Sequence, residues 1–166
     1  MRTVALIAMA IAAWLFWQKK RGGLPTPNEI DCLARVLIVE ARHVPDDDPG
    51  LSEWYAIGWV ARNRAALWGA SICDVVYNRR PARTWNTDTN WNKFMADASK
   101  HKYFDKAKTT AAVILSGVSA NPIGDRINFW HPSGMVPRGR VPTWGRKAVA
   151  DGTALNIGRA VFVKPA

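Results

Sequence analysis

The sequence predicts an α+β fold that is mainly helical. Residues 26–117 carry a succession of helix start and stop signals, whereas residues 127–130 and 160–163 have the character of two short strands. Helices that come first and a small β element that comes last are typical of α+β domains. The 166 residues are enough for one domain with a sizeable core.

The composition excludes several classes of protein. Hydrophobic residues make up 48% of the chain and include nine Trp, which argues against disorder, and two Cys are too few for a disulfide-rich scaffold. Only the N-terminus is apolar enough to enter a membrane, which excludes a multi-span protein. The net charge of +10 favours polyanionic surroundings, such as nucleic acid, anionic lipid or anionic cell-wall polymer.

Residues 1–21 predict a membrane anchor with one transmembrane helix. Residues 4–17 carry no charge and are followed by three basic residues. A helix of that length spans about 21 Å, short of the ~30 Å hydrocarbon core, but Arg2 and Lys19 can extend it by snorkelling. A cleaved signal peptide and a buried helix are the alternatives. The flanking charges favour a cytoplasmic C-terminus.

Residues 22–27 are rich in Gly and Pro and are expected to form a linker. The soluble domain is then expected to cover residues 28–166. Four of the positive charges of the chain precede residue 22, which leaves a net charge of +6 on the domain. The sequence shows no internal repeat and no low-complexity tract.

The first helix is predicted to begin at a Thr cap and to end near Arg42. Its start has the three parts of a capping signature, which are Thr26, Pro27 and Glu29. Its apolar stripe consists of Leu33, Val36 and Leu37.

Glu40 continues this apolar stripe near the C-terminal end of the predicted helix. Burial disfavours a carboxylate, and so does the negative end of the helix dipole. Both effects raise the pKa of Glu40 and predict a proton donor near neutral pH. The alternative is a Glu at the edge of the core that pairs with an Arg, for instance Arg64.

The remaining helices follow from their caps. The second is expected to begin in the run Asp46-Asp47-Asp48-Pro49 and to end at Gly69. Its buried face is marked by Trp54, Ile57, Ala61, Ala65 and Trp68. A short third helix is expected from Ser71 to Tyr77, then a surface loop at 79–92, and helices at 91–99 and 103–116. A Gly- and Pro-rich stretch, 132–146, is expected between the two strands.

Four stretches of the chain stand in an informative order. They are residues 32–42 with Glu40-Ala41-Arg42 at their end, residues 56–64 ending in Asn-Arg, residues 71–77, and a tail with motifs at 128–132, 142–144 and 157–162. Together they resemble the spore-cortex-lytic, SleB-like family of cell wall hydrolases. The resemblance covers residues 32 to 162.

The resemblance implies a lysozyme-like domain in which helices and a small sheet line a cleft. It implies cleavage of peptidoglycan between N-acetylmuramic acid and N-acetylglucosamine, with Glu40 as the catalytic acid. Cys32 and Cys73 fall where the family often has Cys, which makes them a candidate disulfide. Two departures stand out. The acidic stretch before the second helix lengthens one gap, and residues 79–91 replace a Gln-Phe-Ser-Trp-like stretch, with Trp85 and Trp91 as its candidate remnants.

A second carboxylate is not evident in the sequence. Glycosidases usually use two, but Glu29 lies three turns back, Glu53 is early on the next helix, and Asp88 lies in the variable loop. A single Glu suits a lytic transglycosylase, which needs no water nucleophile, metal or cofactor; true hydrolysis stays the alternative. The substrate-binding candidates are Asn63, Asn128, Trp130, His131 and Trp144, although both Trp could equally belong to the core.

Other function classes have weaker support. A zinc amidase would need three protein ligands, and no two of His43, His101 and His131 have helix-face or short-loop spacing. A Cys–His peptidase would use Cys73 or Cys32. A basic, membrane-anchored structural or DNA-contacting protein is the non-enzymatic alternative, because basic residues at 79–83 precede Trp85.

The expected partners are peptidoglycan, a lipid membrane, and virion or envelope proteins; nucleic acid is not favoured. The expected location is a bacterial envelope or a phage virion membrane.

Overall fold

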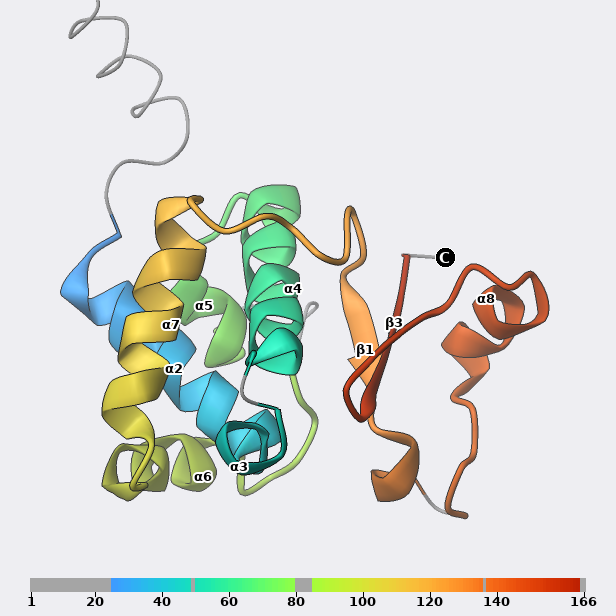
Figure 1. The fold of residues 1–166 in the computed structure, drawn as a ribbon, viewed down its shortest axis with the longest axis horizontal. Helices are drawn as coiled ribbons and strands as arrows, with labels where there is room; N and C mark the ends of the chain where they lie inside the picture. Colours follow the sequence, from blue (N-terminus) through green and yellow to red (C-terminus); the bar gives the residue numbers. More distant parts are fainter. Residues whose placement is uncertain (1–24, 49, 80–84, 136, 165–166) are drawn as a thin grey trace, which may run out of the picture.

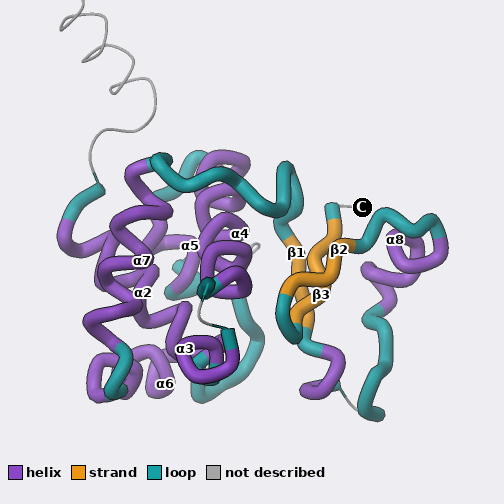
Figure 2. Tube along the Cα trace, viewed as in Figure 1, coloured by secondary structure: helices purple, strands orange, loops and turns teal. Residues whose placement is uncertain are grey.

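The computed structural model describes residues 25–48, 50–79, 85–135 and 137–164. This part of the chain is mainly helical and contains one three-stranded antiparallel sheet, which confirms the predicted α+β class. The helices from residues 27–116 form one side of the molecule, the sheet lies beside them, and a short helix at 146–150 lies beyond the sheet (Figure 1 and Figure 2). The predicted anchor, residues 1–21, lies outside the described residues, and none of the described helices is long and apolar enough to cross a membrane.

Helix α2 (Pro27–Ala41) is the centre of the helical body. The predicted capping box is confirmed, because the Glu29 N–H donates to Thr26 Oγ1 at 3.2 Å and Thr26 N–H donates to Glu29 Oε2 at 3.1 Å. The predicted linker therefore ends earlier, at the Thr26 cap. The apolar stripe is fully buried against helices α4 (Ser52–Trp68), α5 (Ile72–Val76) and α7 (Phe104–Ser116).

The predicted start of the second helix is wrong. The acidic run belongs instead to a separate short helix, α3 (Val44–Asp47). The chain then turns through Leu51, whose φ of 56° is left-handed, before α4 begins. Asp48 stabilises this break, because its carboxylate accepts the Gly50 and Ser52 N–H groups at 3.0 and 2.6 Å. The predicted end at Gly69 is confirmed by its left-handed conformation.

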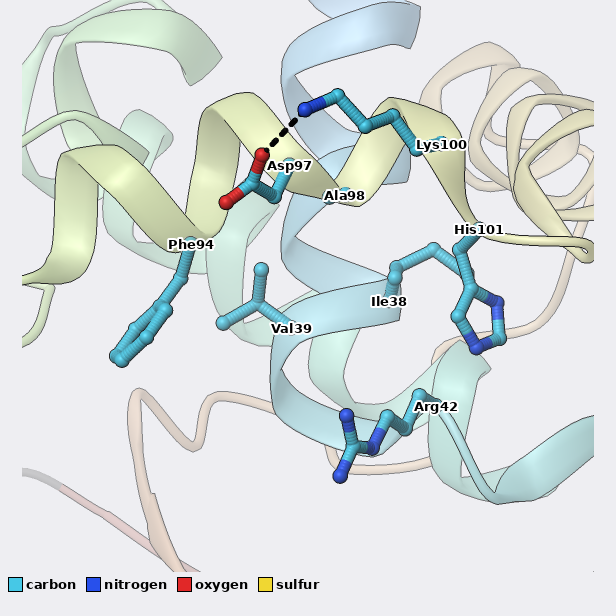
Figure 3. Close-up of a pocket in the computed structure, with 8 residues that line it drawn as sticks. All are labelled: Ile38, Val39, Arg42, Phe94, Asp97, Ala98, Lys100 and His101. Carbon is cyan, nitrogen blue, oxygen red and sulfur yellow. Dashed lines mark hydrogen bonds and ion pairs between the residues drawn. The ribbon is translucent and has the colours of Figure 1, made fainter.

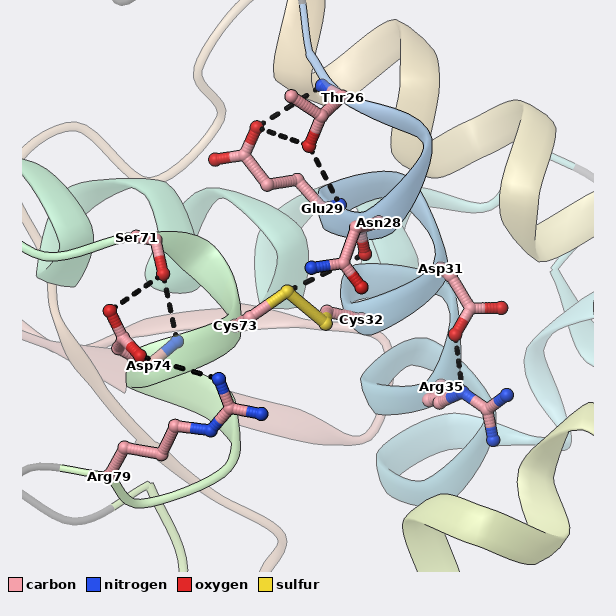
Figure 4. Close-up of a disulfide and its surroundings, with 10 residues drawn as sticks. All are labelled: Thr26, Asn28, Glu29, Asp31, Cys32, Arg35, Ser71, Cys73, Asp74 and Arg79. Atoms are coloured by element: carbon pink, nitrogen blue, oxygen red, sulfur yellow. Dashed lines mark hydrogen bonds and ion pairs between the residues drawn. A yellow bond between two sulfur atoms is a disulfide. The ribbon is translucent and has the colours of Figure 1, made fainter.

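The later helices follow their predicted caps. Ser71 caps α5, and a Cys32–Cys73 disulfide with a Cα–Cα distance of 5.4 Å joins α5 to the first turns of α2 (Figure 4). Helix α6 (Trp91–Asp97) continues into a 3₁₀ turn, η1 (Ala98–Lys100). Helix α7 ends at Gly117 as predicted.

The sheet has the order β1-β3-β2. Strands β1 (Asn128–Trp130) and β3 (Ala160–Val163) confirm the predicted pair, while β2 (Leu155–Ile157) was not predicted. Strand β2 forms a tight hairpin with β3 in which Ile157 pairs with Ala160. The predicted loop contains two 3₁₀ turns, η2 (Pro132–Gly134) and η3 (Thr143–Gly145), and is followed by an unpredicted short helix, α8 (Arg146–Ala150).

Helix α4 joins the helical body to the sheet. It contacts both β1 and β2, and its buried Arg64 donates from Nε to the Ile127 carbonyl at 2.7 Å. The Asn63 amide donates to the carbonyls of Gly124 and Arg126 at 2.7 and 2.8 Å. These bonds hold the loop before β1 against the C-terminal half of α4.

Candidate active site

Glu40 lies in the last turn of α2 and is half-buried. Its Oε1 accepts the indole N–H of Trp85 at 2.8 Å. Burial raises the pKa of Glu40, while hydrogen bonds from Trp85 and Asn86 and the positive charge of Arg64 partly oppose the rise. The pKa is therefore raised, which is the direction that the apolar stripe predicted, and at a given pH a larger fraction of this carboxyl group is protonated than of an exposed Glu.

Asn78 holds the segment that carries Trp85. It adopts a left-handed conformation with φ of 54°, which Asn tolerates better than most residues. Its Nδ2 donates to the Asn86 carbonyl at 2.6 Å, and its Oδ1 accepts the N–H groups of Trp85 and Asn86. The sequence pattern does not single out Asn78, although an Asn directly after a helix is the one local signal of such a turn.

The guanidinium of Arg64 lies over the same indole ring. Its guanidinium carbon lies 4.7 Å from the centre of the Trp85 ring and 5.5 Å from that of Trp68. Burial lowers the pKa of Arg64 to about 10, and the charge of Glu40 opposes this. Among the described residues no ion pair joins Arg64 to Glu40, although each of the two opposite charges shifts the pKa of the other group toward its charged form.

The predicted substrate-binding residues do not form one cluster. Asn63 holds the loop before β1, as described above. Asn128 Oδ1 accepts from Arg64 Nη2 at 3.4 Å and is half-buried. Trp130 is buried, and the half-exposed Trp144 packs edge-on against it with ring centres 5.4 Å apart. Trp144 is therefore the one of this set that presents a large ring surface to solvent.

Phe129 links the last predicted residue, His131, to the Glu40 region. Its ring centre lies 5.9 Å from that of Trp85 and 5.7 Å from that of His131. Phe129 is half-buried and was not predicted as a site residue. The alternation along β1 could have found it, because a strand that buries Trp130 on one face turns Phe129 to the other.

Glu53 is buried in a second polar cluster rather than placed beside Glu40. Its Oε2 accepts the Arg159 N–H at 2.6 Å, and its carboxylate lies 3.6 Å from both His43 Nε2 and His131 Nδ1. Burial lowers the pKa of His131, against the opposing charge of Glu53. The structure thus brings together two histidines that have no informative spacing in the sequence.

The other carboxylates considered as catalytic partners have local roles. Glu29 belongs to the capping box at the opposite end of α2. Asp88 is exposed, and its Oδ1 accepts the Asn90 N–H at 2.8 Å in the turn before α6. Within the described ranges, neither these residues nor Glu53 forms a hydrogen bond or ion pair with Glu40.

The part of the chain that the structure describes contains neither a group of metal-ligating side chains nor a free thiol. No group of three or more His, Cys, Asp or Glu side chains there could hold a metal ion. Both cysteines are joined in the disulfide. Among the basic residues at 79–83, Arg79 lies 3.6 Å from Asp74, and residues 80–83 lie outside the described residues.

Comparison of the chain with protein-family models, curated proteins and solved structures gives no match.

Proposed function

We propose that this protein cleaves the glycan strands of peptidoglycan, with Glu40 as the catalytic acid. The observation that carries the proposal is the environment of Glu40. This carboxyl is held by the Trp85 indole at the C-terminal end of α2, and burial raises its pKa. A general acid needs both a fixed direction and a raised pKa. The ordered motifs that resemble SleB-like hydrolases point to the same residue and to a lysozyme-like arrangement.

The chemistry is that of a lytic transglycosylase. Glu40 donates its proton to the glycosidic oxygen as the bond from that oxygen to C1 of N-acetylmuramic acid breaks. The Glu40 carboxylate then accepts the proton of the 6-hydroxyl of the same sugar as its oxygen bonds to C1, which closes a 1,6-anhydro ring. Atoms and charge balance without water. The placement of Glu29, Glu53 and Asp88 away from Glu40 supports this route over hydrolysis, which usually uses a second carboxylate.

The protein is proposed to act from a membrane, in a bacterial envelope or in a phage virion. Residues 1–21 would supply the anchor. The Cys32–Cys73 disulfide suits an oxidising compartment, and thus favours a domain outside the cytoplasm over the topology suggested by the flanking charges. A protein that lacks residues 1–23 should fold and remain soluble without detergent, and it should cleave soluble glycan fragments at an unchanged rate. Full-length protein that leaves membranes in salt alone would contradict the anchor.

Purified peptidoglycan tests the proposal directly. The wild-type protein should release fragments whose mass shows 1,6-anhydro ends, and Glu40→Gln should retain less than a hundredth of that activity. Reducing ends throughout would make the protein a hydrolase. Absence of any cleavage by the folded wild-type protein would favour the non-enzymatic, basic structural or DNA-contacting alternative.

A further inference from the structure

A groove with a volume of about 630 Å³ opens between α2 and the segment from α6 to His101 (Figure 3). Its floor is apolar and is formed by Ile38, Val39 and Phe94. Phe94 is 42% exposed, so a large ring already faces solvent here. The volume is within the range of sites that bind small ligands.

The polar rim of the groove carries one uncompensated cation. Lys100 is paired with Asp97 at 2.8 Å, whereas Arg42 forms no hydrogen bond or ion pair with any described residue. His101 Nδ1 accepts a hydrogen bond from the Tyr103 N–H at 3.4 Å, which leaves its Nε2 as a donor. Figure 3 shows Val39 between the Phe94 ring and the Arg42 guanidinium. The groove thus offers an apolar floor beside a guanidinium that is suited to a carboxylate.

The position of the groove relative to Glu40 restricts what it can hold. Val39 and Arg42 flank Glu40 within one turn of α2, about 5 Å along the helix axis. Successive side chains point about 100° apart, so the groove and Glu40 lie on different sides of that turn. A polymer that passes Glu40 would reach the groove with a side branch rather than with its backbone.

A lipid chain fits this position poorly. The rim of the groove carries the charged side chains of Arg42, Asp97 and Lys100, which disfavour an acyl chain. The side branch of peptidoglycan is a short peptide that carries methyl groups and free carboxylates, and both match the groove.

We infer that the groove between Val39, Phe94 and Arg42 binds the peptide carried by N-acetylmuramic acid. This inference rests on the proposed function and specifies its substrate as peptide-bearing glycan. The Phe94 ring and the aliphatic floor contact the methyl groups, and the Arg42 guanidinium binds a carboxylate.

Two substrates test the inference with the full-length protein. One is peptide-bearing glycan strands, and the other is the same strands after an amidase has removed the peptides. The wild-type protein should show a kcat/KM about tenfold higher on the peptide-bearing strands. Phe94→Ala and Arg42→Gln should each reduce this preference at least fivefold. Leu67→Ala and Lys164→Gln are matched controls, because they remove an exposed apolar side chain and a surface charge outside the groove, and they should keep the preference.

A wild-type ratio near one would overturn the inference and leave the proposed function intact, as would equal effects of all four variants. Cleavage of neither substrate would instead overturn the proposed function. Calorimetric titration with N-acetylmuramyl tripeptide then decides the groove separately. Binding that Arg42→Gln weakens would support it, and absence of binding to the wild-type protein would reject it.

Discussion

The indole of Trp85 donates to Glu40 Oε1 at 2.8 Å, which joins two residues that are 45 positions apart in the chain. This bond favours the ionised carboxylate, whereas burial favours the protonated form. Burial prevails, so that the pKa is raised while the direction of the group is fixed. Trp85 is therefore a positioning residue for the proposed acid, and Asn78 and Arg64 act through it.

Trp85→Phe should separate orientation from acidity. The variant keeps a ring beside Arg64 and Phe129 but loses the N–H, so the pKa of Glu40 should rise further. The acid must be protonated, so the rate falls as pH increases through this pKa, and the alkaline limb should move to higher pH. The maximal rate should fall about tenfold because one orienting hydrogen bond is lost. A pH–rate profile on soluble glycan fragments measures both effects.

Trp91→Phe is the matched control for this experiment. Its indole N–H donates to the Val76 carbonyl at 2.6 Å and has no bond to Glu40. Its loss should lower stability by about 1 kcal/mol and leave the alkaline limb in place. An identical shift of the alkaline limb in both variants would contradict the role of Trp85 as the residue that positions Glu40.

Gly158→Ala should loosen the junction between α4 and the sheet. A Cβ at this position would overlap Glu53 Oε2, and the φ of 58° is unfavourable for Ala. Gly152 has a φ of 66° with nothing within 4 Å of such a Cβ, so Gly152→Ala incurs the backbone cost alone. That cost is about 1–2 kcal/mol. Chemical denaturation should show a larger loss for Gly158→Ala, and equal losses would mean that the carboxylate moves away freely.

Local signals in the sequence predict much of this fold. Thr26, Ser71 and Gly117 delimit helices because caps act on backbone groups a few residues away. The break between α3 and α4 does not follow from the sequence, because Asp48 followed by Pro49 is also a normal helix start. What marks the break is that the Asp48 carboxylate accepts the N–H groups of Gly50 and Ser52, which lie after it.

The candidate site was predictable only in part, for a related reason. The apolar stripe places Glu40, since periodicity along one helix is local. The contacts of Trp85, Asn78 and Phe129 depend instead on how a loop returns over the end of α2, and no spacing encodes this. The same holds for β2, whose pairing with β3 gives a short and partly polar run its strand geometry.

Glu40→Gln should stabilise the fold at neutral pH while it abolishes cleavage. The pKa of Glu40 is raised in the folded state, so its contribution to stability is complete below the unfolded value of about 4.5 and is lost as pH rises through the folded pKa. Gln carries no charge and can still accept the Trp85 N–H. The melting temperature of the variant should therefore exceed that of the wild type, and the difference should be larger at pH 7 to 8 than at pH 4. A difference that is constant with pH would mean that the carboxylate is not penalised by burial.

The Cys32–Cys73 disulfide should determine whether the domain is stable in a reducing compartment. It closes a separation of 41 residues and fastens the first turns of α2 to α5, a helix of only five residues (Figure 4). Chain-entropy arguments give such a loop a stabilisation of about 4 kcal/mol, a large share of the 5–15 kcal/mol typical of whole domains. Cys32→Ser with Cys73→Ser should lower the free energy of unfolding by roughly that amount in urea. A reductant should shift the wild-type curve onto that of the double variant and leave the variant unchanged. A domain that works outside the cytoplasm would then be fully stable only after it has crossed the membrane. Coincident curves for the oxidised wild type and the variant would show that the packing of α2 on α4 and α7 suffices, and would withdraw the support that the disulfide gives to that location.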